Sequence, residues 1–357
     1  SLAVTVLKNS AVLLLFLLFI SCGTKNKEYA NNVFPYSQFP QEKELKGEVI
    51  ELDTALFRYP FRIRIEGDKA IVLDLHGSDY YGHLFQYPSF RYLSSFGRRG
   101  DSPLEMLSME NFRLHNHTLW TLDANKSELT RLDFSSSGDS LLREETVALD
   151  EDILRPLDFA IYNDTTFVIP DYSGESRFLK VDCKGKLIEK IGTIPTTNKK
   201  ALQEARPALA QAWRSFLDYN SHNSVLATVT QLGEVVEIYN LKDSTHVIRV
   251  GEYDEPEFKV SDGYGIPTGI MGFSDVQVTD DAIYAVFHGT SFKDIARQSG
   301  RLSDGGKYIY VFSLKGEPLC KYVLDHYIYG IWVDEDTKTI IATDVNDDQP
   351  IVMFSIK

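Results

Sequence analysis

The chain repeats one β-strand pattern six times. In each repeat a short strand and a polar turn precede an apolar strand, and a loop and a hairpin follow it. The last positions of the six apolar strands are 49, 48, 58, 58 and 57 residues apart. These strands are 70–74, 119–123, 167–171, 225–229, 283–287 and 340–344. A near-constant period of this size, built from strands, is typical of a β-propeller with one blade per repeat. We therefore expect an all-β, six-bladed propeller with four-stranded blades.

The two ends of the chain together complete the strand count. The sixth repeat supplies only three strands, over 328–332, 339–344 and 351–356. Glu48–Asp53 alternates polar and apolar residues and precedes the first inner strand, Phe61–Ile65. A last blade closed by this N-terminal strand would leave no exposed sheet edge there. A seven-bladed ring with a degenerate blade at 250–273 is the alternative.

One segment departs from the β pattern. Between blades three and four, residues 198–216 carry apolar side chains at helical spacing. These apolar positions are Leu202, Ala205, Leu209, Ala212, Trp213 and Phe216. Pro207 lies inside the segment and should kink or split the helix. The sequence therefore predicts one short helical insertion at this place.

The first 22 residues have a pattern that is typical of an export signal. Lys8 precedes an apolar run of ten residues, 11–20, which is too short to span a bilayer and has the length of a signal-peptide core. The run ends in Ser21-Cys22-Gly23, which resembles a bacterial lipobox. We expect a lipoprotein signal peptide over 1–22 with lipid on Cys22, a flexible tether over 23–46 and the propeller over 47–357. An ordinary secretory signal is the alternative.

Charge and cysteine content restrict the partners. The formal net charge is -14, and no basic stripe interrupts the acidic background, which argues against a nucleic-acid partner. Such a surface favours a soluble monomer. Cys183 and Cys320 fall in non-adjacent blades, so we expect both to be free. We find no nucleophile-elbow, phosphate-loop or zinc-protease motif, and we expect neither a catalytic residue nor a cofactor.

Two residue patterns contain side chains that could bind a metal ion. His115-Asn116-His117 places two imidazoles in a turn without a further ligand nearby, whereas zinc requires three or four. Four of the apolar strands end in aspartate, at Asp74, Asp123, Asp171 and Asp344. These residues could form an acidic ring for Ca²⁺, but Asp side chains also bond the backbone two residues on, as a strand-to-loop corner requires. We expect turn and capping roles, and no metal site.

The segment that ends the first blade carries a family resemblance. Residues 96–105 read FGRRGDSPLE, similar to the phrase at this place in the TolB-like six-bladed propeller lipoproteins of Bacteroides and relatives, a group distantly similar to NHL-repeat propellers. The strand-closing aspartates are a second shared trait, although Val229 and Phe287 replace them in blades four and five. The resemblance covers about 45–357. It implies the propeller fold and a place in the bacterial cell envelope at the outer membrane, on a side left open, and it implies no reaction.

The long insertions suggest where the propeller works. Segments 97–108, 195–213, 250–273 and 288–307 belong to the two loop types that emerge on one face of a propeller. Long loops on a rigid scaffold often carry function, and aromatic and arginine side chains are enriched at binding sites. We expect the binding residues to be Tyr81, Arg98, Arg99, Tyr172 and Arg301. Alternatively, these loops only plug the channel.

These features favour a binding protein over an enzyme. The expected function is a cell-envelope lipoprotein whose propeller is a non-enzymatic binding or scaffolding domain for a peptide, glycan or protein partner. The membrane would be reached through the lipid on Cys22. The alternative is a propeller hydrolase or lyase that acts on a glycan or lactone with a metal bound in the channel.

Overall fold

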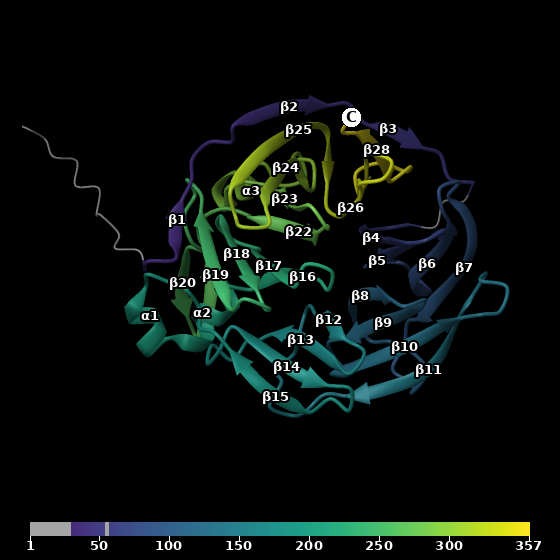
Figure 1. Ribbon diagram of the computed structural model, residues 1–357, viewed down its shortest axis with the longest axis horizontal. Coiled ribbons are helices and arrows are strands. Elements are labelled where there is room, and N and C mark those ends of the chain that lie inside the picture. The colour runs from purple at the N-terminus through teal and green to yellow at the C-terminus, as the bar shows by residue number, and fades with distance from the viewer. Residues whose placement is uncertain (1–29, 54–56) are drawn as a thin grey trace, which may run out of the picture.

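The computed structural model describes residues 30–53 and 57–357, and six sheets form a ring in it (Figure 1). In each blade the first strand faces the centre of the ring and the last lies at the rim. Blades one to three contain β4 (Pro60–Glu66), β5 (Lys69–Asp74), β6 (Tyr80–Gln86), β7 (Arg91–Arg98); β8 (Met109–His115), β9 (Thr118–Asp123), β10 (Glu128–Phe134), β11 (Leu141–Ala148); β12 (Ala160–Asn163), β13 (Thr166–Pro170), β14 (Phe178–Asp182), β15 (Leu187–Ile191). Blades four to six contain β16 (Ser215–Asn220), β17 (Val225–Thr230), β18 (Val235–Asn240), β19 (Thr245–Val250); β22 (Phe273–Val278), β23 (Ala282–Phe287), β24 (Gly306–Ser313), β25 (Pro318–Ile328); β26 (Ile331–Asp334), β27 (Thr339–Thr343), β28 (Ile351–Ser355), β3 (Glu48–Ile50).

The six-bladed prediction is confirmed. The apolar strands that define the repeat are the second strands of the blades, and their side chains are almost all buried on both faces because each blade packs between two others. The segment 250–273 forms no seventh blade. It contains a separate hairpin of β20 (Phe258–Ser261) and β21 (Tyr264–Pro267), which pair only with each other.

The ring closes as expected. Strand β3 pairs antiparallel with β28, with Ile50 opposite Ile351 and Val49 opposite Val352. The N-terminal strand therefore supplies the outer strand of the last blade. In Figure 1 the C-terminus lies beside this strand.

The residues before β3 differ from the expected tether. β1 (Val33–Pro35) lies parallel to β19, and β2 (Gln41–Leu45) lies parallel to β25. Figure 1 shows this segment, in purple, following the rim from blade four to blade six. The expectation of a flexible tether is therefore wrong for residues 33–45. The physical reason is that the outer edges of blades four and five present unpaired backbone groups, which an extended segment can satisfy. The predicted signal peptide and Cys22 lie outside the described residues.

The helical insertion between blades three and four is confirmed and is split. Helix α1 (Lys199–Glu204) begins after Asn198, whose side chain accepts a hydrogen bond from the Ala201 amide. Helix α2 (Arg206–Ala212) has Pro207 in its first turn, so the break falls just before the proline. A further short helix, α3 (Phe292–Arg297), lies in the insertion between β23 and β24 and was not expected. Among the described residues, no helix is long and apolar enough to cross a membrane.

Polar side chains of the inner strands join neighbouring blades around the channel. The carboxylate of Asp158 accepts a hydrogen bond from the Leu217 amide at 2.9 Å, and Asp275 accepts one from Ile331 at 2.9 Å. Each of these bonds reaches about one repeat along the chain. They connect the first strand of one blade, or the residues just before it, to the first strand of the next and so hold the ring in register. These two channel carboxylates are therefore structural.

Candidate functional site

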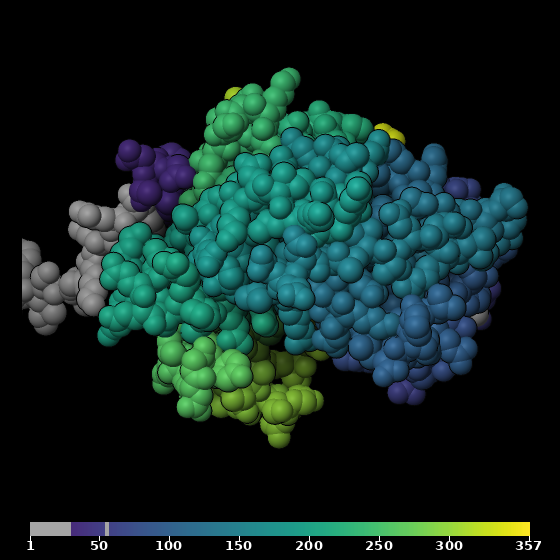
Figure 2. Space-filling model, turned by 90° about the horizontal axis from the view of Figure 1, so that it is seen from below, coloured from purple at the N-terminus to yellow at the C-terminus, as the bar shows by residue number. Residues whose placement is uncertain are grey.

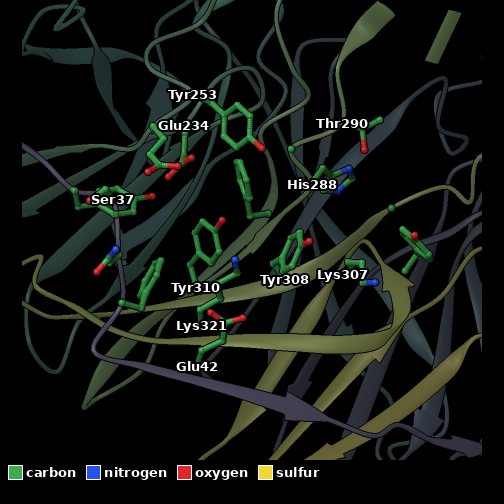
Figure 3. A pocket seen from close by; sticks show the side chains of 18 residues that line it. Ser37, Glu42, Glu234, Tyr253, His288, Thr290, Lys307, Tyr308, Tyr310 and Lys321 are labelled. Carbon is green, nitrogen blue, oxygen red and sulfur yellow. The ribbon is translucent and has the colours of Figure 1, made fainter. Parts of the chain in front are cut away.

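A pocket of about 630 Å³ lies between blades four and five, and we call it the lateral pocket. Figure 3 shows its side chains converging from β24, from β25, from the loops that precede blade five, and from the N-terminal segment that joins β1 to β2. Its lining side chains include seven aromatic rings and three glutamates. These are Tyr36, Phe39, Tyr253, Phe287, Tyr308, Tyr310 and Tyr327, with Glu42, Glu234 and Glu252.

Four of the aromatic rings form a chain of contacts, one pair stacked and two pairs tilted, which we call the aromatic stack. Phe287 and Tyr310 lie nearly parallel, with centroids 4.8 Å apart and 24° between their planes. Phe39 continues the stack at 4.7 Å from Tyr310, and Tyr253 extends it at 5.9 Å from Phe287. Tyr308 and Tyr310 point to one face because alternate residues of a strand share a face. Tyr253 is 52% exposed, so one end of the stack is open to solvent.

Glu234 is the buried acid of this pocket. It lies in the loop between β17 and β18 and is only 4% exposed. A side chain at Gly251 would collide with its carboxylate, so the backbone approaches this group closely. Burial raises the pKa of Glu234 to about 7, and the charge of Glu252 adds to the rise, while Tyr36 and Lys321 oppose it. The carboxyl is therefore about half protonated at neutral pH.

The remaining polar groups sit around the rings. The Lys321 ammonium lies 4.6 Å from the centroid of the Tyr308 ring, and the Lys307 ammonium lies 5.8 Å from that of Tyr327. Burial lowers the pKa of His288 to about 4, so its imidazole is neutral at pH 7. The pocket thus combines flat apolar surfaces with hydrogen-bond donors and acceptors, as small-molecule sites commonly do.

Two of the five predicted binding residues lie together inside the fold. Tyr81 is buried, and its hydroxyl donates a hydrogen bond to the Leu107 carbonyl at 2.5 Å. The Arg99 guanidinium lies 3.7 Å from the Tyr81 ring centroid and donates to the Asp74 carbonyl at 2.9 Å. These contacts fasten the corner between blades one and two.

The other three predicted residues lie apart from one another. Arg98 is exposed, with its Nε 3.9 Å from a Glu105 oxygen. The Tyr172 ring lies beneath Arg214, at 5.7 Å from the guanidinium carbon, and burial raises the pKa of its hydroxyl. Arg301 is exposed in the loop after α3. None of the five lines the lateral pocket, and their role in binding stays a prediction.

The sequence analysis missed every side chain of the lateral pocket, but one signal was available. The alternation Tyr308, Tyr310, Phe312 in an outer hairpin places three large rings on one face of a strand. Tyr36 and Phe39 carried no signal, because their segment was expected to be a tether.

The strand-closing aspartates cap the corners, as expected. Oδ1 of Asp123 accepts the Asn125 amide at 3.1 Å, and Oδ1 of Asp171 accepts the Ser173 amide at 2.9 Å. The equivalent bonds of Asp74 and Asp344 go to residues 76 and 346.

The His115-Asn116-His117 segment is the turn between β8 and β9. Its second and third residues have φ of 47° and 59°, and the His115 imidazole lies 2.8 Å from Asp164. Among the described residues, no three His, Cys, Asp or Glu side chains are placed to hold one metal ion.

Comparison with known proteins agrees with this architecture. No curated protein matches the chain in sequence. A Bacteroides vulgatus protein of the DUF4221 family superposes with a TM-score of 0.58 at 11% identity, over 88% of this chain and 96% of the other. A Bacteroides fragilis protein described as exported gives 0.55 at 11% identity, over 90% and 98%. An auxiliary nutrient binding protein of Bacteroides ovatus gives 0.52 at 9% identity, over 84% and 70%.

At these identities the structural neighbours show the fold alone. The family assignment rests on sequence: the profile described as TolB-like 6-blade propeller-like matches residues 38–336. This span includes β2, the closing strand β3 and the inner strand of the sixth blade. The chain therefore belongs to the TolB-like six-bladed propeller family.

Proposed function

We propose that this chain is an exported, lipid-anchored binding protein whose lateral pocket holds a carbohydrate. The observation that carries the proposal is the aromatic stack open to solvent at Tyr253, with carboxylates and ammonium groups around it. We favour ligand binding over a purely scaffolding function because the volume of the lateral pocket, about 630 Å³, lies in the usual range for ligand sites.

Sugar rings match both kinds of surface in this pocket. One face of a pyranose carries mostly C–H groups, which pack on aromatic rings such as Tyr308 and Tyr253. Its hydroxyls donate to carboxylates such as Glu252 and accept from amines such as Lys307. Charge-assisted bonds of this kind are stronger than neutral ones, so the ring of charged groups can supply specificity while the aromatic stack supplies contact area.

The neighbouring structures support the same class of function. One is a nutrient binding protein and another is described as exported, both from Bacteroides. An exported location also agrees with the apolar run and lipobox-like segment that end at Cys22. Of the three expected partner classes, peptide, glycan and protein, these observations favour a glycan at the lateral pocket.

A hydrolase or lyase is the second candidate, and Glu234 is the observation that favours it. A carboxyl with a pKa of about 7 can donate a proton at neutral pH, and Glu252 is close enough to influence it. Such a pair resembles the acid and base of glycoside hydrolysis. Replacement of Glu234 by Gln separates the candidates, because a binding protein would keep its ligand whereas a hydrolase would lose turnover.

A titration of residues 23–357 with oligosaccharides tests the proposal. The probes are cellotetraose, mannotetraose and maltotetraose, measured by isothermal calorimetry. We expect at least one to bind and Tyr308→Ala to weaken it by about tenfold or more, the usual range for loss of an aromatic contact. Tyr264→Ala is the matched control, since Tyr264 is 62% exposed on the β20–β21 hairpin outside the pocket.

The proposal fails if none of the three sugars binds at millimolar concentration, or if both tyrosine variants weaken binding equally. Product analysis after overnight incubation separates binding from hydrolysis. Cleavage by the unmodified chain that Glu234→Gln abolishes would establish the second candidate.

A further inference from the structure

The central channel opens into a second hollow of about 630 Å³, which we call the channel mouth. It lies at the face of the short turns, whereas the long insertions project from the opposite face, as the green and yellow-green loops do in Figure 2. The inner strands of all six blades line it, namely β4, β8, β12, β16, β22 and β26. It shares no residue with the lateral pocket.

The floor of the channel mouth holds a guanidinium without a carboxylate partner. Arg64 is 4% exposed and lines the hollow. Its Nε donates to the Phe112 carbonyl at 2.8 Å and its Nη2 donates to Asn111 Oδ1 at 3.2 Å. In the described part of the chain, Nη1 makes no hydrogen bond and no carboxylate lies within ion-pair distance of Arg64.

The neighbouring arginine of the channel, Arg113, is paired with carboxylates, unlike Arg64. Arg113 lies 2.7 Å from Asp218 and 3.2 Å from Asp158. The hydrogen-bond partners of Arg64 are neutral, and burial together with the charge of Arg113 lowers the pKa of Arg64 to about 9, while the charges of Asp275 and Asp218 oppose this shift. A buried guanidinium without a directly paired carboxylate is costly, so an anion placed at Arg64 would stabilise its charged form.

The rim of the channel mouth carries the opposite charge. Five carboxylates from three blades surround the opening, namely Glu66, Asp280, Asp334, Glu335 and Asp336. Glu335 Oε1 is buried and accepts no hydrogen bond from any described residue. Burial and the nearby Asp281 and Asp280 raise the pKa of Glu335, which shows that carboxylates crowd this side. A cation at the rim would compensate this charge.

We propose that the channel mouth binds the C-terminal end of a short basic peptide, with its carboxylate on Arg64 and an ammonium group among the rim carboxylates. A purely anionic ligand would be repelled by the rim, and a purely cationic one would leave Arg64 unpaired. A dipolar ligand satisfies both ends.

The spacing of the two ends sets the size of the ligand. Arg64 and Glu66 are two residues apart on β4, so their side chains share a face, about 7 Å apart along the strand, and both residues line the channel mouth. In a free α-amino acid the α-carboxylate and α-ammonium are adjacent and cannot span this distance, so only a second ammonium, such as the ε-ammonium of free lysine, could reach it. A dipeptide with an N-terminal lysine places its α-ammonium near the required separation from its carboxylate, and its ε-ammonium reaches further, among the other rim carboxylates.

Calorimetry with the dipeptide Lys-Ala tests the proposal on the chain 23–357. The comparison ligands are Lys-Ala amide, Glu-Ala, free lysine and acetate. We expect Lys-Ala to bind, and the amide and Glu-Ala to bind about tenfold more weakly or worse, because each lacks one charge-assisted contact. Free lysine distinguishes an amino-acid site from a peptide site, and acetate reports binding of an anion alone.

Variants locate the binding. Glu335→Gln should weaken the binding of Lys-Ala but leave that of acetate unchanged, whereas Glu151→Gln, an exposed change between β11 and β12 outside the channel mouth, should alter neither. Arg64→Gln should abolish binding, and circular dichroism checks that it folds. If Arg64→Gln does not fold, the comparison of Lys-Ala with its amide and the effect of Glu335→Gln still test whether Lys-Ala binds at the channel mouth.

The proposal is overturned if Lys-Ala and its amide bind with equal affinity, or if acetate binds as tightly as Lys-Ala. It is also overturned if calorimetry detects no binding of Lys-Ala at a concentration on the order of 10 mM. Binding of free lysine as tight as Lys-Ala would overturn the peptide assignment. Because the channel mouth is separate from the lateral pocket, failure here leaves the carbohydrate proposal untouched.

Discussion

The protonation of Glu234, a residue of the lateral pocket, changes the free energy of unfolding with pH. Its pKa rises from an ordinary value of 4.5 to about 7 in the folded chain because the carboxyl is buried. Below pH 4.5 the group is protonated in both the folded and the unfolded chain and has no effect. Between pH 4.5 and 7 the unfolded chain loses the proton first, so stability falls as pH rises. Above pH 7 the full loss of about 3 kcal/mol is reached.

We therefore predict that Glu234→Gln removes this pH dependence. The difference in unfolding free energy between the variant and the unmodified chain should grow by about 3 kcal/mol from pH 4.5 to pH 8, in favour of the variant. Urea denaturation at both pH values measures it. A difference that stays constant across this range would show that the pKa of Glu234 is ordinary. Glu175→Gln, an exposed acid, provides the control.

At the scale of elements, β1 and β2 cover two sheet edges that the ring itself leaves open. β19 and β25 are the outermost strands of their four-stranded blades, and each receives a parallel strand from the N-terminal segment. The same segment supplies Tyr36 and Phe39 to the lateral pocket. One stretch of chain thus protects edges and completes a binding surface.

Deletion of this segment should expose both edges. A chain beginning at residue 47 keeps β3, so blade six still closes, but β19 and β25 become unpaired. We expect this chain to self-associate where a chain beginning at residue 30 stays monomeric, since uncovered edges pair with other chains. Light scattering after size-exclusion chromatography compares the two. Equal monomer fractions and equal melting temperatures would contradict the protective role.

At the scale of the whole molecule, the N-terminal segment would limit the distance between propeller and membrane if Cys22 carries lipid. Eleven residue steps separate Cys22 from Val33, where pairing with blade four begins. At full extension these steps span at most about 40 Å. If Cys22 carries lipid, the propeller is therefore held close to the bilayer rather than on a long flexible linker.

The anchor itself is directly testable. Cys22→Ser should shift the protein from the membrane pellet to the soluble fraction after cell fractionation, because lipid is then absent. Cys183→Ser is the matched control, since Cys183 is a free cysteine in the turn between β14 and β15 and should leave the protein in the pellet. Retention of Cys22→Ser in the pellet would refute lipid anchoring at this residue.

The sequence by itself determined the blade count, the closing strand and the capping aspartates. Each of these depends on a local or periodic signal: the spacing of apolar strands, the alternation in Glu48–Asp53, and the tendency of Asp to bond backbone two residues on. The helix break before Pro207 is equally local, because proline lacks the amide that a helix interior needs.

Only the tertiary structure decided where side chains from different blades meet. The lateral pocket joins Tyr36 to Tyr310, and the channel mouth joins Arg64 to Glu335, across gaps that no periodicity encodes. The strands β1 and β2 could not be predicted from the sequence for the same reason. They are short, and their pairing comes from the open edges of distant blades rather than from a pattern of their own. The fold follows from repetition, whereas the sites follow from ring closure, which brings residues hundreds of positions apart into contact.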